Sequence, residues 1–364
     1  MILSEIIREL ESLAPPALQE GYDNSGLIVG NRSMEVSGVL ICLDSIEATI
    51  DEAIHKNCNL VVAHHPIVFS GLKSLTGKTY IERTVLKAIK NDISIYAIHT
   101  NLDNVKTGVN AKIGQLLGIN SPKILAPKTN ILQKLVTYCP QKNSDEVRNA
   151  LFEAEAGSIG NYAECSFNSN GTGTFKANEA ASQHIGNTNE RHLEAETKIE
   201  VVFEAYKKNN LLATLNHTHP YEEVAYEIYD TLNSHQYIGA GMYGDLESEM
   251  EVPEFFDGLK SRFNLKVIRH TKILKNKITR IAWSGGSGSF LLRNAQAVRA
   301  DVFITGDFKY HEFFDHEEKL VIADIGHYES EQFTIELIGD FLKEKFPKFA
   351  VHLTEVNTNP VNYY

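Results

Sequence analysis

The stretch that decides the fold is Val61-Val62-Ala63-His64-His65-Pro66, a short apolar run that ends in two histidines and a proline. An apolar run of this length and type is typical of a strand buried in a parallel sheet. Pro66 cannot donate a ladder hydrogen bond, so we expect the strand to end before it. In an open α/β sheet, residues just beyond the carboxyl ends of strands face the ligand crevice. The two histidines are therefore predicted to lie at such a crevice.

Two further apolar runs end near the same residue types. The run 95–98 is followed by Asp103, and the run 320–325 is followed by His327 and Glu331. Imidazole and carboxylate groups are common ligands of divalent transition metals, and two neighbouring cations can share a bridging carboxylate. The sequence thus predicts a two-metal site. Its expected ligands are His64, His65, Asp103, His327 and Glu331.

Each of these ligands also has a purely structural interpretation. Adjacent histidines in a regular strand point to opposite faces, so one could be buried and the other exposed. Asp103 has two oxygens that could bridge cations, but it could equally cap a helix. The spacing of His327 and Glu331 places both on one helical face, which is also common among solvated residues. The coincidence of three strand ends is what favours a metal site.

Two other polar residues at strand ends could support such a site. His99 follows the run 95–98, and it could hold a ligand by hydrogen bonding or act as a proton shuttle. Asp307 follows another apolar run and could orient a ligand histidine.

A glycine-rich segment, Gly285–Ser289, follows a predicted strand and opens a predicted helix. Free backbone N–H groups in such a turn could hold an anion, although a plain tight turn fits the pattern equally well. Two basic side chains after a later strand could contact the same negatively charged substrate. The expected substrate contacts are Gly286, Ser287, Gly288, Lys309 and His311.

Composition bounds the class of protein. The chain has 364 residues, which suggests two or three domains, with 43% hydrophobic and 23% charged residues. Its net charge of −12 and the lack of a dense Lys/Arg run disfavour nucleic-acid binding. The four scattered cysteines predict neither a disulfide framework nor a zinc–thiolate site. No apolar stretch approaches the roughly 18 residues of a membrane span, and acidic residues near the N-terminus exclude a signal peptide, so we expect a cytoplasmic protein.

The order of predicted elements indicates a split architecture. A β-α-β-α-β alternation up to about residue 125 predicts a mostly parallel sheet, and a similar pattern resumes after 246. Between them, a β-α-β-β-α-β order suggests a ferredoxin-like α+β insert. We therefore predict an α/β metal-binding domain from 1–125 plus 247–364 and an inserted domain at 126–246. The insert also contains 217–223, which is rich in possible metal ligands (His and Glu). A second metal site is possible there, but a turn into a strand is the favoured interpretation.

Together these motifs resemble the NIF-three-like family of dinuclear metal centre proteins, whose bacterial members carry the label GTP cyclohydrolase 1 type 2 homolog. The segment 126–246 resembles the PII-like, or copper-tolerance-like, insert of its longer members. Two departures are Tyr22, where the family usually has Trp, and Ser25, where it has an apolar residue. The stretches that carry the resemblance are Tyr22-Asp-Asn-Ser-Gly-Leu, Ala63-His-His-Pro-Ile, His99-Thr-Asn-Leu-Asp103, Gly285-Gly-Ser-Gly-Ser, Thr305-Gly-Asp-Phe-Lys-Tyr-His311 and Gly326-His-Tyr-Glu-Ser-Glu331.

The resemblance implies two divalent metal ions per chain, with zinc, iron or manganese as the leading candidates. It also implies a ring-shaped homo-oligomer, a hexamer, and a small-molecule substrate. The expected activity is metal-dependent hydrolysis of a nucleotide or a related cyclic amide. A metal-dependent phosphoesterase and a non-catalytic metal-binding regulatory or scaffold assembly are the two alternatives.

Overall fold

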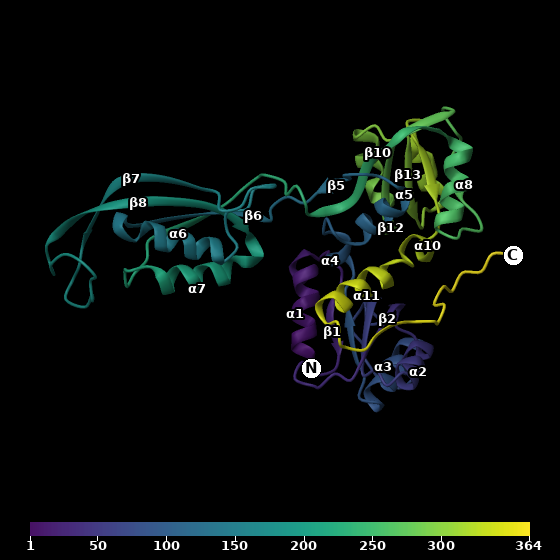
Figure 1. Cartoon of the computed structure of the whole chain (residues 1–364), viewed down its shortest axis with the longest axis horizontal. Coiled ribbons are helices and arrows are strands. Elements are labelled where there is room, and N and C mark those ends of the chain that lie inside the picture. Colours follow the sequence, from purple (N-terminus) through teal and green to yellow (C-terminus); the bar gives the residue numbers. More distant parts are fainter. The chain divides into compact units, whose positions relative to one another are not determined.

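The computed structural model describes residues 1–364, which form two compact units (Figure 1). Unit 1 consists of Met1–Ala126 and Tyr237–Tyr364, and unit 2 is Pro127–Gln236. Unit 2 ends at Gln236 rather than at 246, because the strand that starts at Gly239 pairs with a strand of unit 1. The longest apolar helices in the chain are too short or too polar to span a bilayer.

The first sheet of unit 1 has five strands in the order β1-β4-β3-β2-β15. Only the β1/β4 pair is antiparallel, so the central strands are parallel as the sequence predicts. The strands are β1 (Gly26–Val29), β2 (Val39–Asp44), β3 (Leu60–His65), β4 (Ser94–Ala97) and β15 (Val351–Leu353). The helices that connect or cover them are α1 (Leu3–Leu13), α2 (Glu47–His55), α3 (Tyr80–Lys90), α4 (Thr100–Asp103) and α11 (Thr334–Lys345).

The second sheet of unit 1 has six strands in the order β11-β14-β13-β12-β10-β5. Its centre, β12 to β14, is parallel, while the outer pairs β10/β12 and β11/β14 are antiparallel. The strands are β5 (Lys123–Pro127), β10 (Gly239–Glu251), β11 (Arg269–His270), β12 (Lys277–Ser287), β13 (Val302–Gly306) and β14 (Val321–Asp324). The helices are α5 (Val109–Leu117), α8 (Val252–Arg262), α9 (Leu292–Ala297) and α10 (His327–Glu331).

Two details of this half differ from the sequence prediction. The strand β12 continues to Ser287, so most of the glycine-rich segment lies in a strand end and not in a turn that opens a helix. The sequence also predicts one final helix at about 330–345, whereas the structure has two helices there, α10 and α11, which are separated at Gln332–Phe333. The mixed α/β class itself is confirmed by both sheets.

Trp283 fixes helix α5 against the second sheet of unit 1. It lies on β12 with no exposed surface, and its Nε1 donates a 2.7 Å hydrogen bond to the carbonyl of Asn110 in α5. Gly114, one turn further along α5, leaves room for the indole ring: a Cβ there would lie 2.7 Å from Trp283 Cζ2. The helix that follows Asp103 in the chain is thereby fixed against the sheet that precedes His327.

Unit 2 is a four-stranded antiparallel sheet in the order β7-β8-β6-β9 with two helices. Both helices lie on the same face of that sheet (Figure 1), and their apolar residues form a core with the facing sheet residues. The elements are β6 (Leu132–Pro140), α6 (Ser144–Glu153), β7 (Ser166–Lys176), β8 (Arg191–Glu204), α7 (Lys208–Thr218) and β9 (Tyr226–Asp230). Short 3-10 helices across the whole chain are Pro16–Leu18, Gln141–Asn143, Ala205–Lys207, Ser289–Leu291 and Tyr310–His316.

We predict that Gly114→Ala lowers the melting temperature of the protein by a few degrees. Crowding the buried Trp283 costs about 1–3 kcal/mol, more than the about 0.5–1 kcal/mol that Ala adds to a helix. Gly258→Ala in α8 is the control, because its Cβ would meet only the tip of Arg262 at 3.9 Å. Scanning calorimetry should show a lower melting temperature for Gly114→Ala but not for Gly258→Ala. Equal shifts of melting temperature in both variants would contradict the packing argument.

Candidate metal centre

The two adjacent histidines lie at the end of β3. The strand ends before Pro66 as predicted and includes both His64 and His65, and His65 is still paired with Asp44 of β2. The His64 side chain is fully buried, whereas that of His65 is 21% exposed. Their ring centroids are only 4.9 Å apart, so the two rings lie side by side and do not point to opposite faces of the sheet.

Each of these imidazoles is anchored through its Nδ1 atom. His64 Nδ1 lies 2.8 Å from the carbonyl oxygen of Ile98, and His65 Nδ1 lies 2.8 Å from Asp44 Oδ1. A carbonyl oxygen can only accept, so His64 Nδ1 must carry the proton and donate. In the neutral ring the Nε2 lone pair of His64 is then free to bind a cation.

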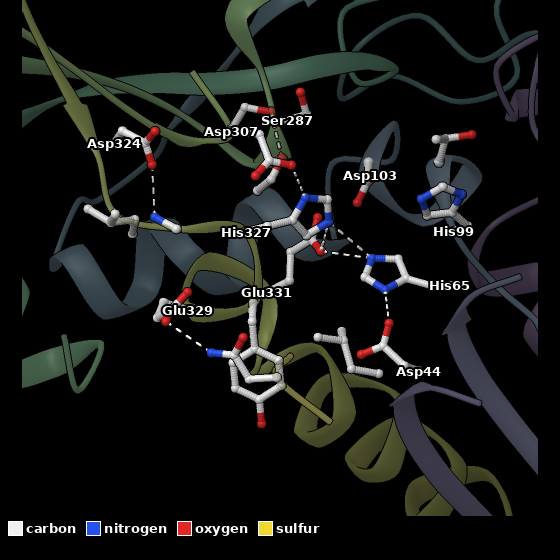
Figure 2. A pocket seen from close by; sticks show the side chains of 18 of the residues that line it. Asp44, His65, His99, Asp103, Ser287, Asp307, Asp324, His327, Glu329 and Glu331 are labelled. Carbon is white, nitrogen blue, oxygen red and sulfur yellow. Dashed lines mark hydrogen bonds and ion pairs between the residues drawn. The ribbon is translucent and has the colours of Figure 1, made fainter. Parts of the chain in front are cut away.

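The third strand end delivers His327 and Glu331 on the short helix α10. His327 Nδ1 is 2.7 Å from Asp307 Oδ2, and its Nε2 is 3.1 Å from Glu331 Oε2. Glu331 is only 3% exposed and its Oε2 also lies 3.0 Å from His65 Nε2. Figure 2 shows the rings of His65 and His327 facing Glu331, with Asp44 and Asp307 behind them.

Asp103 and Glu331 approach His64 from two sides. Asp103 Oδ1 and Glu331 Oε1 each lie 3.8 Å from His64 Nε2, which is too long for a hydrogen bond. Ligand atoms of His64, His65 and Glu331 all lie within 4.8 Å of one another, so this group could hold a metal ion. The structure thus brings all five predicted ligands to one place.

The chemistry of these atoms fits a cation. The Nε2 of His64 and the Oδ1 of Asp103 are buried and have no hydrogen-bond partner, although they face each other. Leaving such groups unpaired costs about 1–3 kcal/mol each, more for charged ones. In addition, the Nε2 atoms of His65 and His327 are only 3.3 Å apart. A metal ion among these lone pairs would satisfy all of them.

The electrostatics of the cluster point the same way. Burial and then the charge of Glu331 raise the pKa of Asp103 to about 7. Burial disfavours a charged His65, but its hydrogen bonds to Asp44 and Glu331 prevail and raise its pKa to about 9. Burial likewise opposes the charge on His327, yet Glu331 and Asp307 raise its pKa to about 11. The carboxylates therefore attract positive charge, which a bound cation would supply in place of these protons.

His99 is a fourth imidazole beside the cluster. Its ring centroid lies 5.3 Å from those of both His64 and His65, and its Nδ1 is 2.7 Å from Asp23 Oδ1. Burial would raise the pKa of Asp23, but hydrogen bonds from His99 and Thr100 outweigh burial and hold it well below its usual range. A proton-shuttle role for His99 remains a prediction that this position suits.

Sequence reasoning missed two of the anchoring carboxylates, Asp23 and Asp44. A signal for Asp44 was present, since it ends the apolar run of β2, the strand next to β3. Asp44 is itself fixed from the C-terminal segment: Thr358 Oγ1 donates a 2.6 Å hydrogen bond to its Oδ2. Asp23 lies in a loop and carries no comparable signal.

A cavity of about 770 Å³ opens beside the cluster. Five aromatic residues line it together with one arginine, Arg269; they are Tyr22, Phe69, Phe290, Tyr328 and Tyr363. Its acidic lining residues are Glu20, Asp44, Asp103, Asp307, Asp324, Glu329 and Glu331.

Of the predicted substrate contacts, the structure brings only Ser287 to this cavity. Lys309 and His311 do not line it. In the glycine-rich segment, the N–H of Gly285 donates to Asn110 Oδ1 at 3.1 Å and that of Gly286 to Ser330 Oγ at 2.9 Å. Gly286 and Gly288 also do not line the cavity, so an anion would find few free donors there.

The His- and Glu-rich segment 217–223 of unit 2 begins at the end of α7 and continues as an irregular connection towards β9. His219 Nε2 lies 3.0 Å from the carbonyl of Tyr138, and its Nδ1 accepts from the N–H of Tyr221 at 3.1 Å. Both ring nitrogens are therefore engaged. The group of His64, His65 and Glu331 is the one cluster of potential ligands that the chain presents.

The family model described as Duf34/NIF3 (NGG1p interacting factor 3) matches residues 1–360. The chain belongs to this family. A curated Halalkalibacterium halodurans protein named GTP cyclohydrolase 1 type 2 homolog is 38% identical over 363 residues, 98% of each chain. A Bacillus subtilis protein of the same name is 34% identical over 99% of this chain and 98% of its own. The crystal structure of a Bacillus cereus protein related to NIF3 has a TM-score of 0.87 at 34% identity, covering 100% of this chain and 99% of that one.

We predict that Asp307→Asn and Asp44→Asn each weaken divalent-cation binding by about 10–100-fold, as is typical when the carboxylate behind a metal-bound histidine is lost. The amide keeps the shape of the side chain but removes the charge that orients the imidazole. Affinity would be measured by competition with a chromophoric chelator on protein stripped of metal. Asp340→Asn, an exposed site on α11, is the matched control. Wild-type affinity in both test variants would show that the carboxylates do not hold the ligands.

Proposed function

We propose that this family member binds two divalent cations per chain and is a metal-dependent hydrolase. The observation that carries the proposal is the pair of buried, partnerless ligand atoms, His64 Nε2 and Asp103 Oδ1. One cation would be held by His64 with Asp103, and the other by His65 with His327. Glu331 would bridge them, because its Oε1 faces His64 while its Oε2 faces the other two histidines. Zinc, iron and manganese all suit imidazole and carboxylate ligands without a thiolate.

Two bound cations would lower the pKa of a shared water, which gives a hydroxide nucleophile at neutral pH. The residues around them have separate tasks. Asp44 and Asp307 hold the rings of His65 and His327 in place by hydrogen bonds to Nδ1. His99, which lines the cavity and is held by Asp23, would carry a proton between the reacting group and solvent.

The substrate that we propose is a nucleotide or a related cyclic amide. The names of the relatives support it, and so does a cavity large enough for a drug-sized molecule. On a guanine ring, water would attack C8 and open the five-membered ring. A second water would then release that carbon as formate.

We also propose an assembly and a fold for the insert. The strand order β7-β8-β6-β9, with both helices on one face, is consistent with a ferredoxin-like, PII-like insert. The family resemblance supports a ring-shaped homohexamer, and we propose that it is located in the cytoplasm. Light scattering of the purified protein measures the mass of the assembly and so tests the hexamer.

We expect protein purified without added metal to contain about two divalent cations per chain, and Asp103→Asn to lose at least one. The amide cannot supply the negative charge that compensates a buried cation. Elemental analysis checks both, with Asp340→Asn as the control. Wild-type protein that stays metal-free after supplementation with zinc, manganese and iron would remove the hydrolase mechanism.

We expect the metal-loaded protein to release formate from GTP or from guanosine, and the Asp103→Asn variant to release none. Formate and inorganic phosphate would be quantified in the same reactions. Phosphate without formate would identify a phosphoesterase. If fully metal-loaded protein releases neither formate nor phosphate, guanine nucleotides are excluded as the substrate and a non-catalytic assembly is favoured.

A further inference from the structure

Of the exposed aromatic side chains that line the cavity, two come from neighbouring loops beside His99. Tyr22 is 63% exposed and Phe69 is 48% exposed, and both line the cavity. Their ring centroids are 6.1 Å apart with planes tilted by 37°, and Phe69 lies 6.3 Å from the ring of His99. His99 in turn lies 5.3 Å from His64 and His65. An unbroken series of rings therefore leads from the surface to the metal ligands.

These rings are held in place by polar contacts of their loops. Asn24 Nδ2 donates a 2.6 Å hydrogen bond to the carbonyl of Val68, which ties the Tyr22 loop to the Phe69 loop. Asp23 anchors the first loop to His99 and to the backbone N–H of Thr100. The two rings thus form a preorganised surface, which we call the aromatic platform, although little of it is buried in the core. Such surfaces bind planar rings by stacking.

The charge of the cavity restricts what else the ligand can carry. Seven carboxylates line it, but Arg269 is its only Lys or Arg side chain. That guanidinium is already engaged, with Nη1 3.2 Å from Asp324 Oδ2 and Nη2 donating to the carbonyl of Phe308 at 2.8 Å. Two divalent cations together with Arg269 would not offset all seven carboxylates. A chain of phosphates would therefore meet net negative potential and no free basic side chain.

We propose that the cavity binds an uncharged planar heterocycle, a nucleobase or nucleoside, stacked on the aromatic platform of Tyr22 and Phe69. Phosphate groups are not part of what it recognises. This inference rests on the proposed function for the identity of the reacting ring. It narrows the proposed substrate class from nucleotides to nucleosides and nucleobases, which carry no phosphate. The stacked ring would lie next to His99, whose own ring is 5.3 Å from those of His64 and His65.

The test is equilibrium dialysis of guanosine and of GTP against zinc-loaded protein freed of excess zinc. We expect guanosine to bind more tightly than GTP. Phe69→Leu and Tyr22→Leu should each raise the dissociation constant for guanosine by about tenfold, the usual effect of removing one stacking ring. Tyr22→Phe should bind like wild type, because it keeps the ring.

Phe314→Leu is the matched control, since Phe314 is 66% exposed and does not line the cavity. Metal content and melting temperature are measured for each variant, so that loss of binding is not confused with loss of metal or fold. GTP binding more tightly than guanosine, absence of guanosine binding, or an unchanged dissociation constant in Phe69→Leu would each overturn the proposal.

The outcomes separate this inference from the proposed function. Guanosine binding that depends on Phe69, without any formate release, would refute the hydrolase and leave the aromatic platform standing. Formate release from GTP that is equal in wild type and Phe69→Leu would refute the aromatic platform and leave the hydrolase standing.

Discussion

The structure of unit 1 depends on the burial of the Glu331 carboxylate among three imidazoles. A buried carboxylate is costly unless positive charge and hydrogen bonds compensate it. His65 and His327 contact its Oε2 at 3.0 and 3.1 Å, and His64 faces its Oε1. Because these residues come from two different sheets, the charge compensation also joins the two halves of the chain.

The anchoring contacts make this arrangement rigid. Each imidazole has a different acceptor behind it: a carbonyl for His64, and an aspartate for His65 and His327. The backbone is shaped to allow this. Asp307 adopts a left-handed conformation with φ of 59°, and Gly326, just before His327, has φ of 95°. Strained positions of this kind persist where the surrounding structure determines them, and they cluster at functional sites.

The same acidic surroundings define the cavity around the site. Carboxylates that attract cations also repel phosphates, so one distribution of charge favours metal binding and disfavours highly charged substrates. The apolar part of the recognition then falls to the exposed rings of Tyr22 and Phe69. Tyr22 thus presents an aromatic face at the cavity.

The sequence by itself pointed to the residues that the structure gathers around Glu331, because buried strands are recognisable from local apolar runs and the polar residues that end them are conspicuous. It also predicted the mixed α/β class with parallel strands at the centre of each sheet. Only the tertiary structure decided that His65 stays within β3, that Asp44 and Asp23 anchor the imidazoles, and that Lys309 and His311 lie off the cavity. It also showed that Asn110 and Ser330 occupy the N–H groups of Gly285 and Gly286. These features depend on contacts between residues up to hundreds of positions apart, and no local pattern of residue types encodes the register and packing that create them.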